Sequence, residues 1–193
     1  ISGAANIYTN GAGILFESGN GDLRVEDSYF HGNQNGILVG SGAGMDVAIT
    51  RSEFSANGLA PDVPVVGLPH NLYVNGVDTL TVTDSYFNSV NTAHELKSRA
   101  LATTITHSRF DDGAGSQASY SIDMPNGGVA LIQGNQIGKG PDSVNRHAIH
   151  YGGELVPVYP GSMLQVIDNV MTNLRTAGGT GIYNQSQATA GGV

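Results

Sequence analysis

The sequence predicts an all-β fold, a right-handed single-stranded parallel β-helix of about six to seven coils with inserted loops. Three observations predict it. A four-residue phrase recurs at intervals near two dozen residues, each clear copy follows a strand of alternating apolar and polar residues, and Asn-Gly pairs mark the turns. One coil of this length cannot bury its own inner face, so the coils must stack. We therefore expect one domain spanning residues 1–193.

The recurring phrase ends in an apolar residue that we expect to point inward. The last residues of successive copies are 24, 33, 23, 27 and 34 positions apart. The longer intervals indicate the same coil with a loop inserted. The clear copies are Asp27-Ser28-Tyr29-Phe30, Arg51-Ser52-Glu53-Phe54, Asp84-Ser85-Tyr86-Phe87 and His107-Ser108-Arg109-Phe110, and weaker copies lie at 134–137 and 168–171.

Two predicted strands and a variable loop complete each coil. The strands that precede the phrase lie at 23–26, 47–50, 80–83 and 103–106, and the strands that open the coils lie at 14–16, 37–39, 72–74, 96–98, 149–151 and 182–184. Insertions are predicted at 59–69, 113–118, 140–145 and 153–161. Loops that leave a solenoid on related sides commonly build the walls of a groove.

Composition excludes several classes of protein. The formal net charge is −8, which disfavours nucleic acid and anionic membrane surfaces as partners. The chain has no cysteine, so it forms no disulfide and no thiolate metal site. It contains no apolar run long enough for membrane insertion. Because it begins at Ile1, we expect a processed or truncated piece of a longer protein.

Stacking makes equivalent positions of successive coils neighbours, about 4.8 Å apart. The opening strands then give an inward row of Ile14, Ile37, Leu72, Leu96, Ile122, Ile149 and Ile182. The next position points outward and holds Leu15, Leu38, Tyr73, Lys97, Asp123, His150 and Tyr183. Its first coils offer leucine, whereas its middle coils offer four different acid–base side chains. This change in character is the main functional signal in the sequence.

Such a face suits chemistry on a uronic acid. Elimination or epimerisation needs a cation on the sugar carboxylate, a base for the C5 proton and an acid. Lys97 and Arg99 are the candidate carboxylate ligands. His150 and Tyr73 are the candidate base and acid, in either order. Asp123 would orient His150 or hold Lys97.

The flanking positions are also predicted to face outward. They supply the candidate substrate-binding residues Asn71, Asn75 and Glu95. A structural interpretation stands beside the functional one. Lys97 and Asp123 would form an ordinary ion pair between coils, while His150 and Tyr73 would only cover the sheet.

Two groups of residues carry side chains of the kinds that bind metal ions. His70, His94 and His147 form a row near the start of their coils, where a structural ladder is favoured over a transition-metal site. The carboxylates of Asp22 and of residues 111–113 lie in predicted exposed turns without a calcium-binding motif. No metal site and no cofactor are therefore predicted, although the surface carboxylates leave Ca²⁺ open as a bound ion.

The coil pattern resembles the pectate-lyase-like superfamily of right-handed parallel β-helices over nearly the whole chain. That resemblance implies an extracellular polysaccharide-engaging protein, secreted or on the cell surface, with an anionic or neutral glycan as its partner. It further implies a lyase or C5-epimerase of uronic-acid polymers. The Asp-rich signatures of polygalacturonases and the Asp-Pro-His signature of alginate epimerases are absent, and residues 123–125 read Asp-Met-Pro instead.

A non-enzymatic surface module is the alternative, either an adhesin, a tailspike-like binder or a filament or matrix subunit. The short chain favours it, because lyases of this superfamily usually have more coils. A structural spacer within a larger protein is a third interpretation. The terminal segments 1–10 and 185–193 are short and rich in Gly and Ala, so they would cap the stack weakly. Self-association through exposed end coils is therefore expected.

Overall fold

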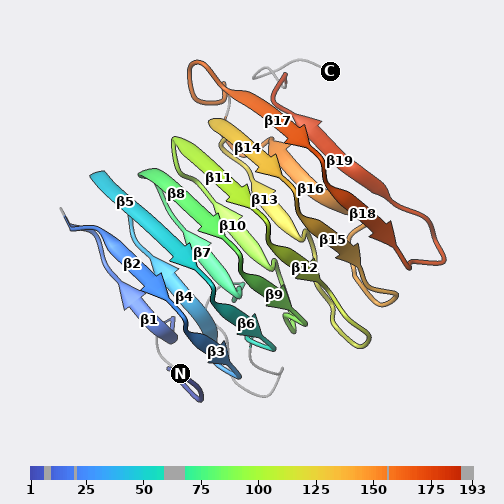
Figure 1. The fold of residues 1–193 in the computed structure, drawn as a ribbon, viewed down its shortest axis with the longest axis horizontal. Coiled ribbons are helices and arrows are strands. Elements are labelled where there is room, and N and C mark those ends of the chain that lie inside the picture. Colours follow the sequence, from blue (N-terminus) through green and yellow to red (C-terminus); the bar gives the residue numbers. More distant parts are fainter. Residues whose placement is uncertain (7–9, 20, 59–67, 156, 188–193) are drawn as a thin grey trace.

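The computed structural model describes residues 1–6, 10–19, 21–58, 68–155 and 157–187, which form strands, turns and irregular connections (Figure 1). All paired strands are parallel, and they form three sheets. Within these described ranges no helix could cross a membrane. The predicted insertion at 59–69 lies largely outside them.

Each sheet takes every third strand of the chain. The first sheet contains β1 (Ala12–Phe16), β4 (Asn35–Val39), β7 (Leu72–Val74), β10 (Leu96–Ser98), β13 (Ile122–Met124), β16 (His147–Gly152) and β19 (Thr180–Gln185). The second contains β2 (Leu23–Glu26), β5 (Gly42–Thr50), β8 (Val77–Thr83), β11 (Ala102–Thr106), β14 (Val129–Gln133) and β17 (Met163–Ile167). The third contains β3 (Tyr29–His31), β6 (Glu53–Ser55), β9 (Tyr86–Asn88), β12 (Arg109–Asp111), β15 (Gln136–Lys139) and β18 (Val170–Asn173). This arrangement fits a parallel β-solenoid, as predicted.

The first residue of the recurring phrase makes the corner between the second and third sheets. It adopts a left-handed backbone, with φ of 49° at Asp27, 50° at Asp84 and 53° at Asp168. Asp tolerates this conformation better than most residues, because its short polar side chain can hydrogen-bond locally. The conformation turns the chain sharply before the next strand.

The second residue of the phrase builds a polar ladder along that corner. The backbone N–H of Ser52 donates to Oγ of Ser85 at 3.2 Å, and the N–H of Ser85 donates to Oγ of Ser108 at 3.0 Å. Asn135 continues the ladder by accepting the N–H of Ser108 at 2.8 Å. Each buried backbone donor therefore finds a partner in the next coil, as a buried corner requires.

The fourth residue of the phrase forms the apolar core. Phe30, Phe54, Phe87 and Phe110 stack with ring centroids 5.0, 4.7 and 4.9 Å apart. All four rings are at most 1% exposed. Their regular spacing follows from the in-register pairing of the third sheet.

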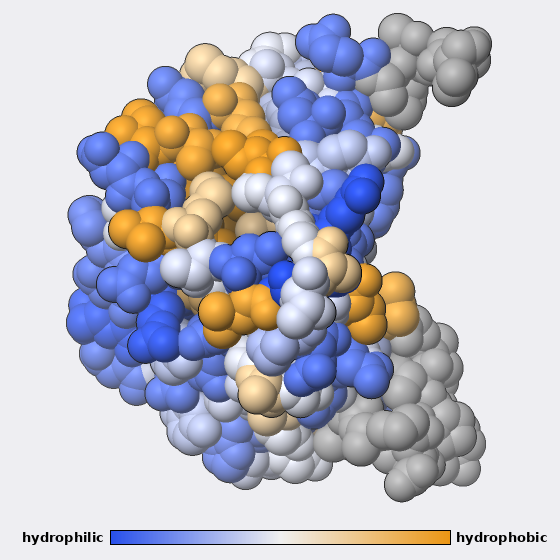
Figure 2. All heavy atoms as spheres, turned by 90° about the vertical axis from the view of Figure 1, so that its right-hand side faces the viewer, coloured by the Kyte–Doolittle hydropathy of each residue, from blue (hydrophilic) through white to orange (hydrophobic). Residues whose placement is uncertain are grey.

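The two ends of the stack differ. At the N-terminal end, the amino group of Ile1 donates to the carbonyl of Tyr29 at 2.5 Å, and Ser2 bridges to His31. At the other end, inward-facing Ile182 is 39% exposed, although its partner Ile149 is fully buried. Figure 2 shows apolar atoms gathered among polar ones on this side of the molecule.

Candidate functional site

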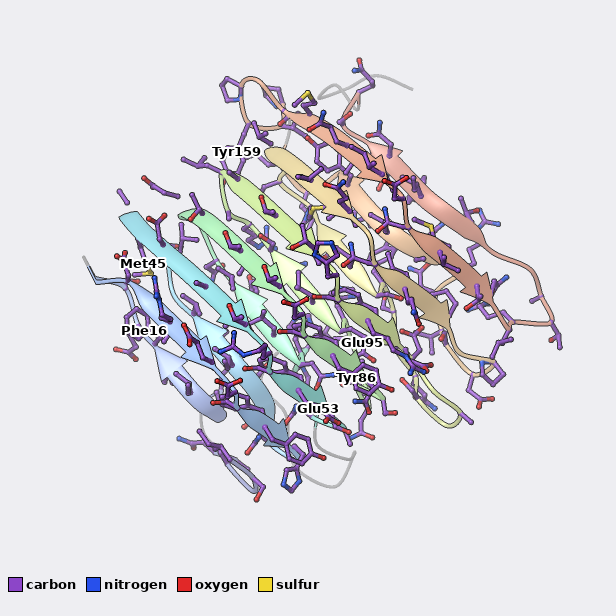
Figure 3. All side chains as sticks on the ribbon, in the orientation of Figure 1. Phe16, Met45, Glu53, Tyr86, Glu95 and Tyr159 are labelled. Carbon is purple, nitrogen blue, oxygen red and sulfur yellow. The ribbon has the colours of Figure 1, made fainter. Side chains whose placement is uncertain are left out.

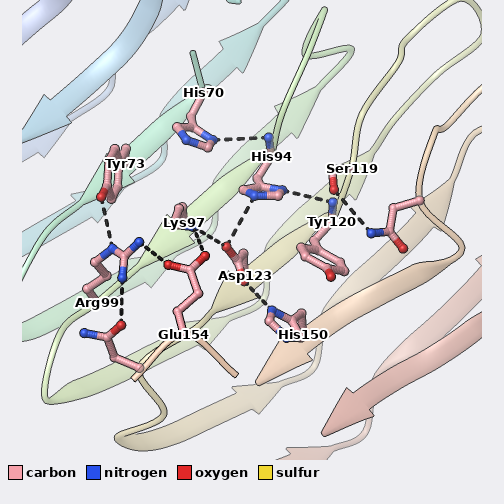
Figure 4. Close-up of polar contacts among 12 residues, drawn as sticks. His70, Tyr73, His94, Lys97, Arg99, Ser119, Tyr120, Asp123, His150 and Glu154 are labelled. Carbon is pink, nitrogen blue, oxygen red and sulfur yellow. Dashed lines mark hydrogen bonds and ion pairs between the residues drawn. The ribbon is translucent and has the colours of Figure 1, made fainter. Parts of the chain in front are cut away.

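The outward row lies on neighbouring strands of the first sheet, in the predicted register. Tyr73 on β7 pairs with Lys97 on β10, Lys97 pairs with Asp123 on β13, and Asp123 pairs with His150 on β16. These residues, which are widely separated in the sequence, therefore form one continuous row (Figure 4). The register prediction is confirmed.

Asp123 is the centre of the row. Its Oδ1 lies 2.7 Å from Nδ1 of His150, and its Oδ2 lies 2.8 Å from Nζ of Lys97 and 3.3 Å from Nε2 of His94. The residue is only 1% exposed. Burial by itself would raise the pKa of Asp123, but the hydrogen bond from His150 and the nearby cations outweigh it and lower the pKa to about 2. Asp123 is therefore a permanent carboxylate that orders its neighbours.

Lys97 and Arg99 point outward from alternate positions and share one carboxylate. Nζ of Lys97 donates to Oε1 of Glu154 at 2.8 Å, and Nη2 of Arg99 donates to Oε2 of the same residue. Arg99 also donates from Nε to the hydroxyl of Tyr73 at 3.0 Å and from Nη1 to Asn126 at 2.8 Å. We call the paired cationic groups of Lys97 and Arg99 the carboxylate cradle.

Glu154 is a residue of the candidate site that sequence reasoning missed. It belongs to the predicted insertion 153–161, which lies outside the repeated strands. Burial by itself would raise the pKa of Glu154, yet the hydrogen bonds from Lys97 and Arg99 lower it. In the sequence, the one feature that could have indicated Glu154 is that it is a carboxylate in an insertion next to the strand that carries His150.

Both ring nitrogens of His150 form hydrogen bonds, and the ring stacks on two tyrosines. Nδ1 bonds to Asp123, and Nε2 lies 2.8 Å from Oε1 of Gln185. Its ring stacks on Tyr120 at 4.5 Å and on Tyr183 at 5.6 Å between centroids. Burial by itself would lower the pKa of His150, but the hydrogen bonds to Asp123 and Gln185 raise it. This environment favours the imidazolium form, in which both nitrogens donate.

The second histidine row forms a stacked ladder. His70 stacks on His94 at 5.0 Å, and His94 stacks on Tyr120 at 5.1 Å. The backbone N–H of His94 donates to Nδ1 of His70 at 3.2 Å, and the N–H of Tyr120 donates to Nδ1 of His94 at 3.0 Å. Burial lowers the pKa of His94 to about 4, so this ring is neutral at physiological pH. Among the described residues no group of three His, Asp or Glu side chains could hold a metal ion.

Two predicted substrate-binding residues lie inside the protein. Asn71 and Glu95 are 0% exposed, so the prediction that they face outward is wrong. Each occupies the corner before its strand, where strand alternation does not yet apply. Asn57 donates to Oδ1 of Asn71 at 2.7 Å, and Asn71 donates to Glu95. Figure 3 places Glu95 in the middle of the stack. Burial raises the pKa of Glu95 well above its usual value.

Asn75, the third predicted substrate-binding residue, remains beside the row. It is partly exposed and accepts a hydrogen bond from the Tyr73 hydroxyl at 2.9 Å. Tyr73 and Asn75 also line a hollow of about 370 Å³, whose walls include Leu15 and Leu38 from the first coils. The polar row therefore continues into a partly apolar hollow on the same sheet.

One carboxylate that was expected to be exposed is buried. Asp112 is 0% exposed, and its Oδ2 lies 2.5 Å from Nζ of Lys139 and accepts from Ser143 at 2.6 Å. The prediction of an exposed turn is therefore wrong for Asp112, which pairs with a lysine instead of facing solvent. Asp22 is exposed as predicted and accepts the backbone N–H of Asp46 at 3.0 Å.

In comparisons with known proteins, no family model matches the chain, and no curated protein and no solved structure matches it. The geometry must therefore carry the functional argument. It provides a buried lysine and a partly exposed arginine that together bind a carboxylate, beside a tyrosine hydroxyl and a histidine ordered by a buried aspartate.

Proposed function

We propose that this protein is a secreted or cell-surface β-helix that binds polysaccharides containing uronic acids and acts on them as a lyase or C5-epimerase. We further propose a right-handed helix of six to seven coils of the pectate-lyase-like type, since connections between parallel strands of one sheet are nearly always right-handed. One observation carries the functional proposal. Lys97 and Arg99 hold a carboxylate between them, on the same face as Tyr73 and His150.

The local charge supports an anionic ligand over a neutral one. The carboxylates of Asp123 and Glu154 are opposed by Lys97, Arg99 and His150, whose pKa is raised. With His150 protonated, these five residues carry a net charge of +1, although the whole chain has a formal net charge of −8. Clefts of one sign raise the local concentration of ligands of the opposite sign.

The proposed chemistry assigns a role to each side chain. The cradle neutralises the sugar carboxylate, which makes the adjacent C5 proton more acidic. His150 is the acid, since its surroundings favour the protonated ring, and gives its proton to the leaving oxygen or to C5. Tyr73 is the base in its phenolate form: its hydroxyl proton passes to solvent first, and the oxygen, which Arg99 contacts, then takes the C5 proton. Because Gln185 occupies Nε2 of His150, the amide must move aside before that nitrogen can transfer a proton. Asp123 positions His150 and Lys97.

A non-enzymatic binding module is the second candidate. One observation favours it: Lys97, Asp123 and His150 are 7%, 1% and 4% exposed, and each already has a partner within the protein. A glycan could then bind through Arg99, Tyr73 and the hollow near Leu15 without being changed. An adhesin, a tailspike-like binder or a matrix subunit would work in this way.

Turnover separates the two candidates. The protein is incubated with alginate, pectate and other uronans, and ultraviolet absorbance reports new C4–C5 double bonds while NMR reports epimers. We expect turnover by the wild-type protein and by Arg24→Gln, which changes an exposed arginine on the second sheet. His150→Gln should be folded and inactive. Absence of both products across the panel would remove the enzymatic proposal.

A further inference from the structure

Glu154 occupies the place that the proposed function assigns to the ligand. Its two carboxylate oxygens are divided between Nζ of Lys97 and Nη2 of Arg99. A uronate carboxylate presents the same two oxygens on a planar group, and arginine recognises this geometry with parallel donors. An external carboxylate and Glu154 therefore compete for the same donors.

Exposure indicates which partner can leave. The side chain of Glu154 is 44% exposed, whereas those of Arg99 and Lys97 are 23% and 9% exposed. Glu154 thus covers the cradle from the solvent side. Two glycines precede it, Gly152 at the end of β16 and Gly153 at the start of the loop, with φ of 82° and 96°, conformations that other residues rarely take.

The cradle keeps its shape when Glu154 is removed. Lys97 retains its ion pair with Asp123, and Arg99 retains its bonds to Tyr73 and Asn126. Among the contacts of Lys97 and Arg99 named above, two are lost: the hydrogen bond from Nη2 of Arg99 and the one from Nζ of Lys97 to Glu154. Because two cations would then face one carboxylate, the vacated site would carry an excess positive charge and two free donors.

We propose that Glu154 is a built-in stand-in for the carboxylate of the ligand, and that a uronic-acid ligand enters the cradle by displacing it. This inference rests on the proposed function and deepens it, because it names the group that the ligand must carry. It also implies that Glu154 lowers the affinity for the ligand, because it competes for Lys97 and Arg99. The apparent affinity falls in proportion to the fraction of molecules in which the cradle is open.

The test compares wild-type protein with Glu154→Ala and Glu154→Gln by calorimetric titration with fully de-esterified oligogalacturonate. Both variants should bind on the order of 10-fold more tightly, because the competing carboxylate is gone. Methyl-esterified oligogalacturonate, which lacks the charge, should show no gain. Glu26→Gln is the matched control, since Glu26 also pairs with an arginine but on another sheet. It should leave the affinity unchanged.

A second probe separates this inference from the proposed function. Acetate should raise the melting temperature of Glu154→Ala and not that of wild-type protein, and adding Arg99→Gln to the variant should abolish the effect. If the wild-type protein binds the oligomer and neither Glu154 variant binds it more tightly, the inference is wrong and the proposed function stands. If acetate stabilises Glu154→Ala while no protein binds the oligomer, the competition is supported and the polysaccharide proposal fails. If neither probe binds, both fail.

Discussion

Oδ1 of Asp123 lies 2.7 Å from Nδ1 of His150, across two strands whose residues are 27 positions apart in the sequence. The same carboxylate contacts Lys97 through Oδ2. One buried aspartate therefore connects His150, the proposed acid, to Lys97, which is proposed to bind the carboxylate of the sugar. Such a residue determines both the stability and the protonation of the site. The first two predictions test these two effects.

Asp123→Asn should reduce the free energy of unfolding by about 3–5 kcal/mol, because it leaves Lys97 and His150 without their buried counter-charge. Chemical denaturation measures this loss. Asp84→Asn is the control, since Asp84 is exposed and Asn tolerates the same left-handed backbone. It should change stability by less than about 0.5 kcal/mol. Equal effects of the two substitutions would contradict the central role of Asp123.

His150 should make stability fall as the pH rises. Its pKa in the folded protein is raised above the usual value of 6.5, so the folded state holds the proton more tightly than the unfolded state. The stabilisation is complete below pH 6.5 and is lost as the pH rises through the folded pKa. The difference in unfolding free energy between wild type and His150→Gln, measured across pH, should shrink in that window. A difference that grows there would contradict the raised pKa.

His94 should act in the opposite direction at lower pH. Its pKa is lowered from 6.5 to about 4 by burial, so the unfolded state binds the proton first as the pH falls. Stability should therefore decrease between pH 6.5 and 4 because of this residue. His94→Asn should flatten that part of the profile, as measured by denaturation at each pH. A profile unchanged by the substitution would show that His94 is not buried as a neutral ring.

Asn33, Asn57 and Asn71 form a buried row of hydrogen-bonded side chains, and removing its middle member should reduce the free energy of unfolding. Asn57→Ala removes the acceptor of Asn33 and the donor to Asn71, both in fully buried positions. Each buried polar group left without a partner costs about 1–3 kcal/mol, and denaturation should show a loss of this order. Asn91→Ala, at an exposed position, is the control. Equal stability of the two variants would indicate that water replaces the lost contacts.

Much of the fold could be predicted from the sequence because coils repeat. The Ser and Phe positions of the recurring phrase recur for reasons that stacking imposes, a ladder of hydrogen bonds and a column of rings. The register that brings Lys97 beside Asp123 followed from the same repeat. Strand alternation predicted the register of the first sheet, but Lys97, Asp123 and His150, which it predicts to face outward, are buried, at 7%, 1% and 4% exposed.

The parts of the site that were missed lie where that periodicity ends. Alternation predicts outward side chains at Asn71 and Glu95, but each lies one residue before its strand, in a corner that turns the side chain inward. Glu154 comes from an insertion, and no repeat specifies the path of an inserted loop. Gln185 lies at the end of the last strand, where no repeated position singles out an amide.

Recognition of a charged sugar carboxylate is the central claim, and a glycan array tests it most directly. The wild-type protein and Arg99→Lys are applied to matched uronate and neutral oligosaccharides. Lysine keeps the charge of Arg99 but not its paired donors, so we expect selective binding of uronates by wild type and a loss on the order of 10-fold in the variant. Equal retention of uronate and neutral glycans, or identical binding by both proteins, would contradict the account.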